Sequence, residues 1–136
     1  MSGKTETPSI ESEAAHLLGE DGAFAKEVPG FVVRDAQQIL GTQIERVIAE
    51  KGLLMAEAGT GTGKTFSYLV PALVSGLKTV VSTGTKALQD QLFEKDLPAV
   101  ARILGITPKL SLLKGRSNYL CPYRLEKFLQ ELFYQL

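Results

Sequence analysis

A glycine-rich run at residues 57–65 has the residue types and the spacing that bind phosphate. It reads EAGTGTGKT, and the apolar stretch LLMA precedes it at 53–56. Glycines let successive backbone N–H groups turn toward a phosphate without a Cβ in the way, and the start of a following helix adds positive charge. Lys64 is expected to reach the β- and γ-phosphates of ATP, and the Thr65 hydroxyl to coordinate Mg²⁺. The predicted site comprises Ala58, Gly59, Thr60, Gly61, Thr62, Gly63, Lys64 and Thr65.

The run departs at one position from the usual phosphate-loop pattern, GxxxxGK[ST]. Ala58 stands where that pattern has its first glycine. Alanine is small enough for the turn, so the departure weakens the match only slightly. The alternative is a flexible Gly/Thr loop between two elements, and the adjacent lysine and threonine argue against it.

The elements around this loop alternate between short apolar stretches and helical patterns. Strands are expected within 53–56, 77–82 and 109–113. Helices are expected at 10–18, at 35–51 with Gly52 as the C-cap, from 65 onward, and at 86–93, 99–104 and 122–136, whereas 22–31 looks like a loop. Pro71 is expected to kink or shorten its helix. This alternation predicts an α/β fold, in which helices flank a parallel sheet.

Composition limits the class of protein without naming a function. The 136 residues are 44% hydrophobic and 22% charged, with 15 basic and 15 acidic side chains, which is typical of a globular domain. No apolar run reaches membrane-spanning length, and MSGKTETPSI does not resemble a signal peptide. A single cysteine excludes an internal disulfide and fits a reducing cytoplasm, so we expect a cytoplasmic protein. Residues 86–136 hold 8 basic and 5 acidic groups, which permits contacts with phosphates.

Three hydroxyl side chains follow the second expected strand. They are Ser82, Thr83 and Thr85, and a helical pattern begins just after them. Ligands of open α/β sheets bind at the carboxyl ends of the strands, so these hydroxyls would share an edge with the phosphate loop. They can donate hydrogen bonds to phosphate oxygens. Ordinary capping of the next helix by Thr83 or Thr85 is the alternative, and it needs no ligand.

Two other side chains have a possible role that the residues alone do not decide. The Gln37 amide can donate and accept at once, as the edge of an adenine requires, but from the residues alone an exposed, solvated helix start is the favoured interpretation. Cys121 ends a turn that also contains Lys114, Arg116 and Tyr119. A lone cysteine is usually a small buried apolar residue, and a metal site would need partners.

Together, four segments in order resemble the DinG/XPD-type iron–sulfur DNA helicases of superfamily 2, most nearly their bacterial YoaA-like branch. The segments are RDAQ at 34–37, EAGTGTGKT at 57–65, VVSTGTKALQDQL at 80–92 and LLKGRSNYLCP at 112–122. The resemblance covers about residues 22–136. It implies that Gln37 senses adenine and that residues 59–65 bind ATP phosphates and Mg²⁺. It further implies that Ser82, Thr83 and Thr85 contact single-stranded DNA, and that Cys121 is the first of four ligands of a [4Fe–4S] cluster.

The resemblance also implies that this chain is an N-terminal fragment of such a helicase. Residues 1–21 would be a tail with a short helix, and 22–136 part of an incomplete RecA-like P-loop NTPase domain. Residues 114–136 would begin the inserted cluster domain. Three cluster cysteines, the Walker B acidic segment and the second RecA-like domain are missing from the 136 residues.

The resemblance thus predicts an enzyme that couples ATP hydrolysis to translocation on single-stranded or forked DNA. The fragment alone is expected to bind nucleotide weakly at most, with negligible turnover, no unwinding and no stable cluster. The competing hypothesis is a nucleotide-binding or regulatory module that does not hydrolyse ATP. A different P-loop enzyme, such as a kinase, would leave 79–92 and 114–122 unexplained.

Overall fold

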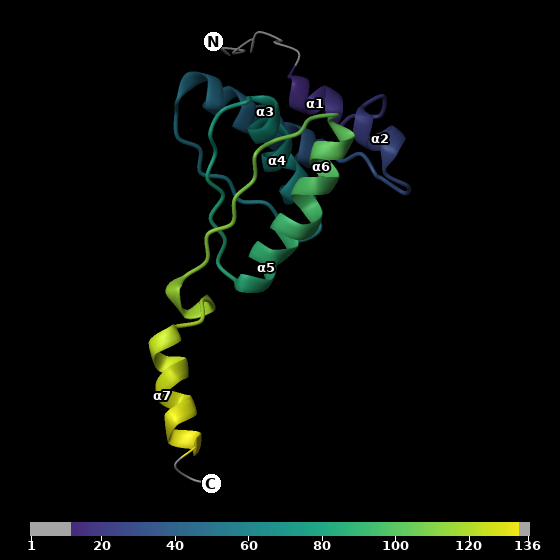
Figure 1. Ribbon diagram of the computed structural model, residues 1–136. Coiled ribbons are helices and arrows are strands. Elements are labelled where there is room, and N and C mark those ends of the chain that lie inside the picture. The colour runs from purple at the N-terminus through teal and green to yellow at the C-terminus, as the bar shows by residue number, and fades with distance from the viewer. Residues whose placement is uncertain (1–11, 134–136) are drawn as a thin grey trace, which may run out of the picture.

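The computed structural model describes residues 12–133, and these form a cluster of helices from which a last helix projects (Figure 1). The cluster contains α1 (Glu13–Leu17), α2 (Ala23–Glu27), α3 (Asp35–Glu50), α4 (Lys64–Val74), α5 (Lys86–Gln91), the π-helical turn η1 (Leu92–Asp96) and α6 (Leu97–Ile103). A 3₁₀ turn, η2 (Arg116–Asn118), and the projecting helix α7 (Pro122–Phe133) follow.

Helix α1 is fixed to α3 by one carboxylate. The Ser12 hydroxyl caps α1 by accepting from the N–H of Ala15 at 3.1 Å, and it donates to Glu45 of α3 at 2.5 Å. The Glu45 carboxylate also accepts from the backbone N–H groups of Glu13 at 3.2 Å and Ala14 at 3.0 Å. Two of the free N–H groups of the first turn are thus satisfied from another helix. The part of the expected helix at 10–11 lies outside the described residues.

The expected loop at 22–31 is wrong over half its length, because it contains α2. Phe24 of this helix is fully buried, and its ring centroid lies 5.2 Å from that of Phe66 and 5.9 Å from that of Phe31. A five-residue helix is too short to show a repeating apolar pattern. Burial of one aromatic side chain, rather than helix propensity, holds it in place.

Helix α3 matches the expected helix at 35–51 to within one residue, but Gly52 is not its C-cap. Lys51 adopts the left-handed conformation, with φ of 53°, and the N–H of Gly52 donates to the carbonyl of Val47 at 3.0 Å. The chain therefore leaves the helix one residue earlier than the glycine indicated. Helix α4 includes Pro71 and ends three residues beyond it.

The two expected helices at 86–93 and 99–104 are one continuous helical run. The π-helical turn η1 joins α5 to α6 and ends two residues before Pro98. Proline has no N–H, so it cannot complete the regular i→i−4 bond to the carbonyl of Glu94. A local widening to π geometry accommodates such a break without ending the helix.

A small apolar core forms where α1, α2, α4 and α6 meet. Helix α3 packs most extensively on α4. The buried core residues are Ala14, Leu18, Phe24, Leu69, Val70, Leu92 and Val100. Helix α4, which directly follows the phosphate loop, contributes Leu69 and Val70 to this core.

The three expected strands form no ladder within residues 12–133, where the structure contains no strand. Their apolar side chains are exposed: Leu53 is 93%, Met55 95% and Val80 89% accessible. The parallel sheet therefore stays a prediction. Helix α7 buries none of its side chains, although Phe128, Leu129 and Leu132 lie at helical spacing. No helix within 12–133 is long and apolar enough to cross a membrane.

Candidate nucleotide-binding site

The glycine-rich run forms a loop that leads directly into α4. Gly61 and Gly63 have φ of 77° and 76°, a region that side chains with a Cβ enter only with strain. Gly63 is the residue before the first turn of α4, and its carbonyl accepts from the N–H of Phe66 at 3.1 Å. The Thr62 hydroxyl donates to the carbonyl of Gly59 at 2.9 Å and closes the loop. This is the loop-to-helix arrangement that the sequence predicted.

Lys64 lies across the loop it follows. Its Nζ donates to the carbonyl oxygens of Ala58 at 2.5 Å and Gly59 at 3.0 Å. The ammonium group is therefore held at the loop, where a bound phosphate would compete for it with the two carbonyls. Ala58 takes part in this contact through its backbone, so the missing first glycine removes no hydrogen-bonding group.

Gln37 is brought to the loop, and the alternative of an exposed helix start is wrong for this residue. Its side chain is only 1% accessible, and Nε2 donates to the carbonyl of Gly63 at 3.1 Å. Within the described part of the chain, its buried Oε1 has no hydrogen-bond partner. Ser67 of α4 is also fully buried, and its hydroxyl donates to the backbone carbonyl of Gln37 at 3.1 Å. Helices α3 and α4 are thus joined at the last glycine of the loop.

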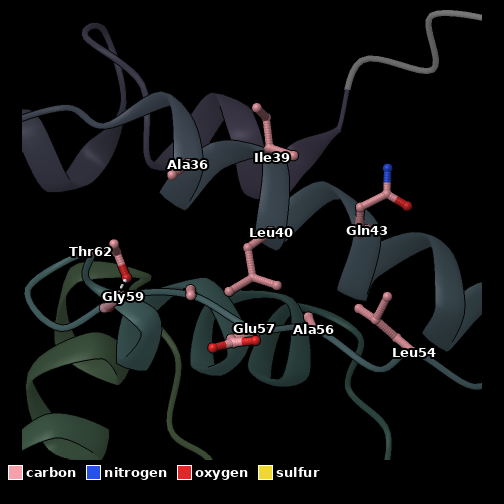
Figure 2. Close-up of a pocket in the computed structure, with 10 residues that line it drawn as sticks. Ala36, Ile39, Leu40, Gln43, Leu54, Ala56, Glu57, Gly59 and Thr62 are labelled. Carbon is pink, nitrogen blue, oxygen red and sulfur yellow. Dashed lines mark hydrogen bonds between the residues drawn. The ribbon is translucent and has the colours of Figure 1, made fainter.

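A cavity of about 410 Å³ lies between α3 and the segment that leads into the loop (Figure 2). In Figure 2, Leu40 points from α3 toward the 56–59 segment, whereas the Ile39 and Gln43 side chains point away from it. The lining residues are Ala36, Ile39, Leu40, Gln43, Leu54, Ala56, Glu57, Ala58, Gly59 and Thr62. The cavity is mainly apolar and touches the phosphate loop at one end, as a pocket for a nucleoside would.

The hydroxyls after the second expected strand lie at the start of α5. Thr85 caps this helix, because its Oγ1 accepts from the N–H of Leu88 at 3.2 Å. Thr83 Oγ1 donates to the carbonyl of Thr85 at 3.3 Å. The capping alternative is therefore confirmed for Thr85. Ser82 is exposed.

The turn at 114–121 supplies a single thiol. Cys121 is free and exposed, and no group of three or more His, Cys, Asp and Glu side chains within 12–133 could hold a metal ion. An iron–sulfur cluster of the expected type needs four thiolates. The described residues therefore do not make a cluster site by themselves.

Two pKa shifts occur near these segments. Burial raises the pKa of Tyr68 on α4 above its ordinary 10.0, and a hydrogen bond with Thr65 partly opposes this. The Asp90 carboxylate raises the pKa of Lys114, whose Nζ lies 2.6 Å from Asp90 Oδ1. Sequence reasoning missed both Ser67 and Asp90. Ser67 lies one helical turn after Gly63, a spacing that could have marked it, whereas Asp90 and Lys114 have no local signal that pairs them.

Comparison with known proteins shows which proteins this chain is related to. The chain is 47% identical over 121 residues to the ATP-dependent DNA helicase YoaA of Haemophilus influenzae, covering 89% of this chain. It is 51% identical over 107 residues to the same-named protein of Escherichia coli, covering 79%. It is 34% identical over 117 residues to the 3'-5' exonuclease DinG of Bacillus subtilis, covering 83%.

The chain is therefore a homologue of the YoaA helicases and of DinG. This confirms the resemblance that the four segments predicted. The match spans 19%, 17% and 13% of the lengths of the three YoaA and DinG relatives, so the chain corresponds to less than a fifth of each. No protein-family model matches the sequence, and no solved structure matches it significantly.

Proposed function

We propose that this chain binds ATP through the loop at 58–65, as the nucleotide-binding part of an ATP-dependent DNA helicase. The observation that carries the proposal is that the loop leads directly into α4 and is also hydrogen-bonded to α3. Gly63 is the last residue of the loop, Lys64 begins α4, and the Gln37 amide of α3 donates to the Gly63 carbonyl. The names of the YoaA relatives, ATP-dependent DNA helicases, support the same assignment.

In this proposal each loop residue has a separate role. Lys64 exchanges the carbonyls of Ala58 and Gly59 for phosphate oxygens, and the backbone N–H groups of 59–63 surround the same phosphates. Thr65 coordinates Mg²⁺ through its hydroxyl. The adenine contact assigned to Gln37 would use its unpaired acceptor Oε1. This atom is buried and Gln37 does not line the cavity, so the side chain would have to leave the Gly63 carbonyl to reach a base.

We propose an incomplete RecA-like α/β domain for residues 22–136, with residues 1–21 as a tail and short helix. The parallel sheet would use 53–56, 77–82 and 109–113. The support is their apolar composition together with the exposure of Leu53, Met55 and Val80, because a parallel sheet with helices on its faces would bury these side chains.

The DNA-binding and cluster assignments follow the family. Ser82, Thr83 and Thr85 would contact single-stranded or forked DNA through hydroxyl and backbone groups. Cys121 would be one cluster ligand, with residues 114–136 as the start of that domain. The three further thiolates would have to come from outside these 136 residues, since the sequence has one cysteine.

Titration calorimetry with MgATP tests the proposal. Lys64→Ala should weaken binding by about 2 kcal/mol or more, roughly thirtyfold, because a charge-assisted contact to phosphate is lost. Thr65→Ala should weaken binding only when Mg²⁺ is present. Lys78→Ala removes an exposed lysine away from the loop and should change nothing. Equal affinities of the wild-type chain and Lys64→Ala would reject the proposed site.

Two further measurements separate the alternatives. Turnover of ATP by the chain alone should be negligible, and Lys64-dependent hydrolysis would contradict that expectation. Gln37→Ala should reduce the preference for ATP over GTP, whereas Gln38→Ala, one residue along α3, should not. An unchanged preference in Gln37→Ala would limit Gln37 to holding the loop.

A further inference from the structure

Two neighbouring side chains of α5 hold the chain just before α7, 24 residues further along the sequence. Gln89 Nε2 donates to the carbonyl of Leu113 at 2.8 Å. Asp90 Oδ1 pairs with Lys114 Nζ at 2.6 Å. The backbone N–H of Lys114 in turn donates to the hydroxyl of Tyr119 at 3.2 Å. These contacts link α5 to the turn at 114–121, which Figure 1 shows between the helical cluster and α7.

The ammonium group of Lys114 is paired with a carboxylate of the same chain. Asp90 Oδ1 is shielded from solvent, and Lys114 is its ionic partner. The two side chains are 27% and 40% accessible, so this is a partly exposed ion pair, and such pairs stabilise only modestly. The same contact raises the pKa of Lys114 and keeps it protonated.

Arg116 and Tyr119 are the groups of this turn that remain available. Both are exposed, and Arg116 has no carboxylate partner within residues 12–133, where the ion pairs are Arg46–Glu50 and Asp90–Lys114. A guanidinium binds phosphate and an exposed aromatic ring stacks on bases, which together suit single-stranded nucleic acid. Asp90 lies little more than one helical turn after Thr85.

We propose that Asp90 is a positioning residue that, through Lys114, holds the turn at 114–121 beside Ser82, Thr83 and Thr85, so that the two segments form one surface for single-stranded DNA. This inference rests on the proposed function, which assigns the three hydroxyls to DNA. Arg116 then supplies a phosphate contact and Tyr119 a stacking surface, while Lys114 acts only within the protein.

Replacement of Asp90 should change the affinity for single-stranded DNA in the direction opposite to the one that its charge alone predicts. Asp90→Asn removes a negative charge from a DNA-binding surface, which by charge alone should strengthen binding. We expect it instead to weaken binding of a fluorescent oligothymidylate, measured with nucleotide present, by about fivefold, the scale of one partly exposed ion pair. Glu94→Gln removes the same charge one turn along, without the 2.6 Å contact, and should not weaken binding. Stronger binding by Asp90→Asn would overturn the proposal, because Lys114 would then be a phosphate ligand held back by Asp90.

A charge exchange tests whether the contact, rather than either residue, matters. Lys114→Asp alone should weaken binding, and the double variant Asp90→Lys with Lys114→Asp should recover most of the loss. Failure of the double variant to recover would also overturn the proposal. Arg116→Ala should lower the slope of log K against log salt by about one, as loss of a single phosphate contact does.

A DNA-independent measurement separates this inference from the proposed function. Cys121 is the only cysteine, so it can carry one spin label and Ala87→Cys of α5 a second. The distance distribution between them should be narrow, broaden in Asp90→Asn, and stay narrow in Glu94→Gln. Absence of DNA binding with the broadening present would reject the DNA assignment alone. An unchanged distribution in Asp90→Asn would reject the positioning role.

Discussion

The apolar side chains of the helical cluster and those of the segments between its helices lie in opposite environments. Phe24, Leu69 and Val70 are almost completely buried, whereas Leu53, Met55 and Val80 are largely exposed. A helix satisfies its own backbone hydrogen bonds, so it needs from its neighbours only one packed face. A strand needs a partner for its backbone as well. Apolar composition alone therefore does not decide whether a segment is buried, because an extended segment also needs a partner for its backbone.

The largest expected effect is on stability, and it differs between a buried and an exposed phenylalanine. Phe24→Ala should lower the free energy of unfolding by about 3–5 kcal/mol, because a fully buried ring that contacts Phe31 and Phe66 is removed. Phe128→Ala on α7, where the side chain is 58% exposed, should change it by less than about 0.5 kcal/mol. Urea denaturation followed by circular dichroism measures both. A similar loss for Phe128→Ala would mean that α7 packs against something in solution.

The second prediction concerns the loop at the border of the two regions. Gly61 and Gly63 have nearly the same φ, so alanine at either should cost about 1–2 kcal/mol in backbone strain. A Cβ on Gly63 would also lie 2.3 Å from Gln37 Nε2, whereas a Cβ on Gly61 meets nothing within 4 Å. Gly63→Ala should therefore cost a further ~1–3 kcal/mol, from a displaced buried amide.

Thermal unfolding of the two glycine variants, with Gln37→Ala combined with Gly63→Ala, checks this account. The combination should recover part of the extra loss. If Gly61→Ala proves as damaging as Gly63→Ala, the contact between Gln37 and the loop does not contribute to stability.

A smaller effect is expected where α1 is fixed to α3. Glu45→Ala removes the carboxylate that binds Ser12 and two backbone N–H groups of α1, and should cost about 1–2 kcal/mol. Glu50→Ala, five residues along the same helix, breaks only the exposed pair with Arg46 and should have no measurable effect. Hydrogen exchange should show that Glu45→Ala exposes the amides of α1 first, and uniform loss of protection would contradict the local role.

The smallest expected effect is a dependence on alkaline pH. The pKa of Tyr68 is raised in the folded chain, so its contribution to stability is present below its ordinary pKa of 10.0 and is lost as the pH rises through the folded-state pKa. The free energy of unfolding should therefore fall more steeply above pH 10 in the wild-type chain than in Tyr68→Phe. Tyrosinate absorbance of the two proteins, compared by difference, identifies the titration. Parallel pH profiles would show that Tyr68 is more exposed in solution than its place on α4 indicates.

Features that depend on a pattern within one element could be predicted from the sequence. The sixteen residues of α3 show a regular apolar spacing, and the loop before α4 has spaced glycines followed by lysine and threonine. Contacts between residues that are far apart in the sequence could not be predicted. Asp90 meets Lys114, and Ser67 meets the carbonyl of Gln37, only because helices pack together. Helix α2 was missed for the same reason, since one buried ring stabilises it. The parallel sheet was predicted from the alternation of short apolar stretches with helical patterns, and it stays a prediction.

The position of Lys64 bears on how tightly a nucleotide can be held. Its ammonium group already donates to two carbonyls of the loop, so a phosphate gains new bonds only as these are released. Rotation of an exposed side chain takes picoseconds to nanoseconds, so this exchange does not slow association. The exchange does affect how a measured affinity for a nucleotide is interpreted. The measured free energy of the lysine–phosphate contact is the difference between two sets of charge-assisted hydrogen bonds, and it understates the strength of either.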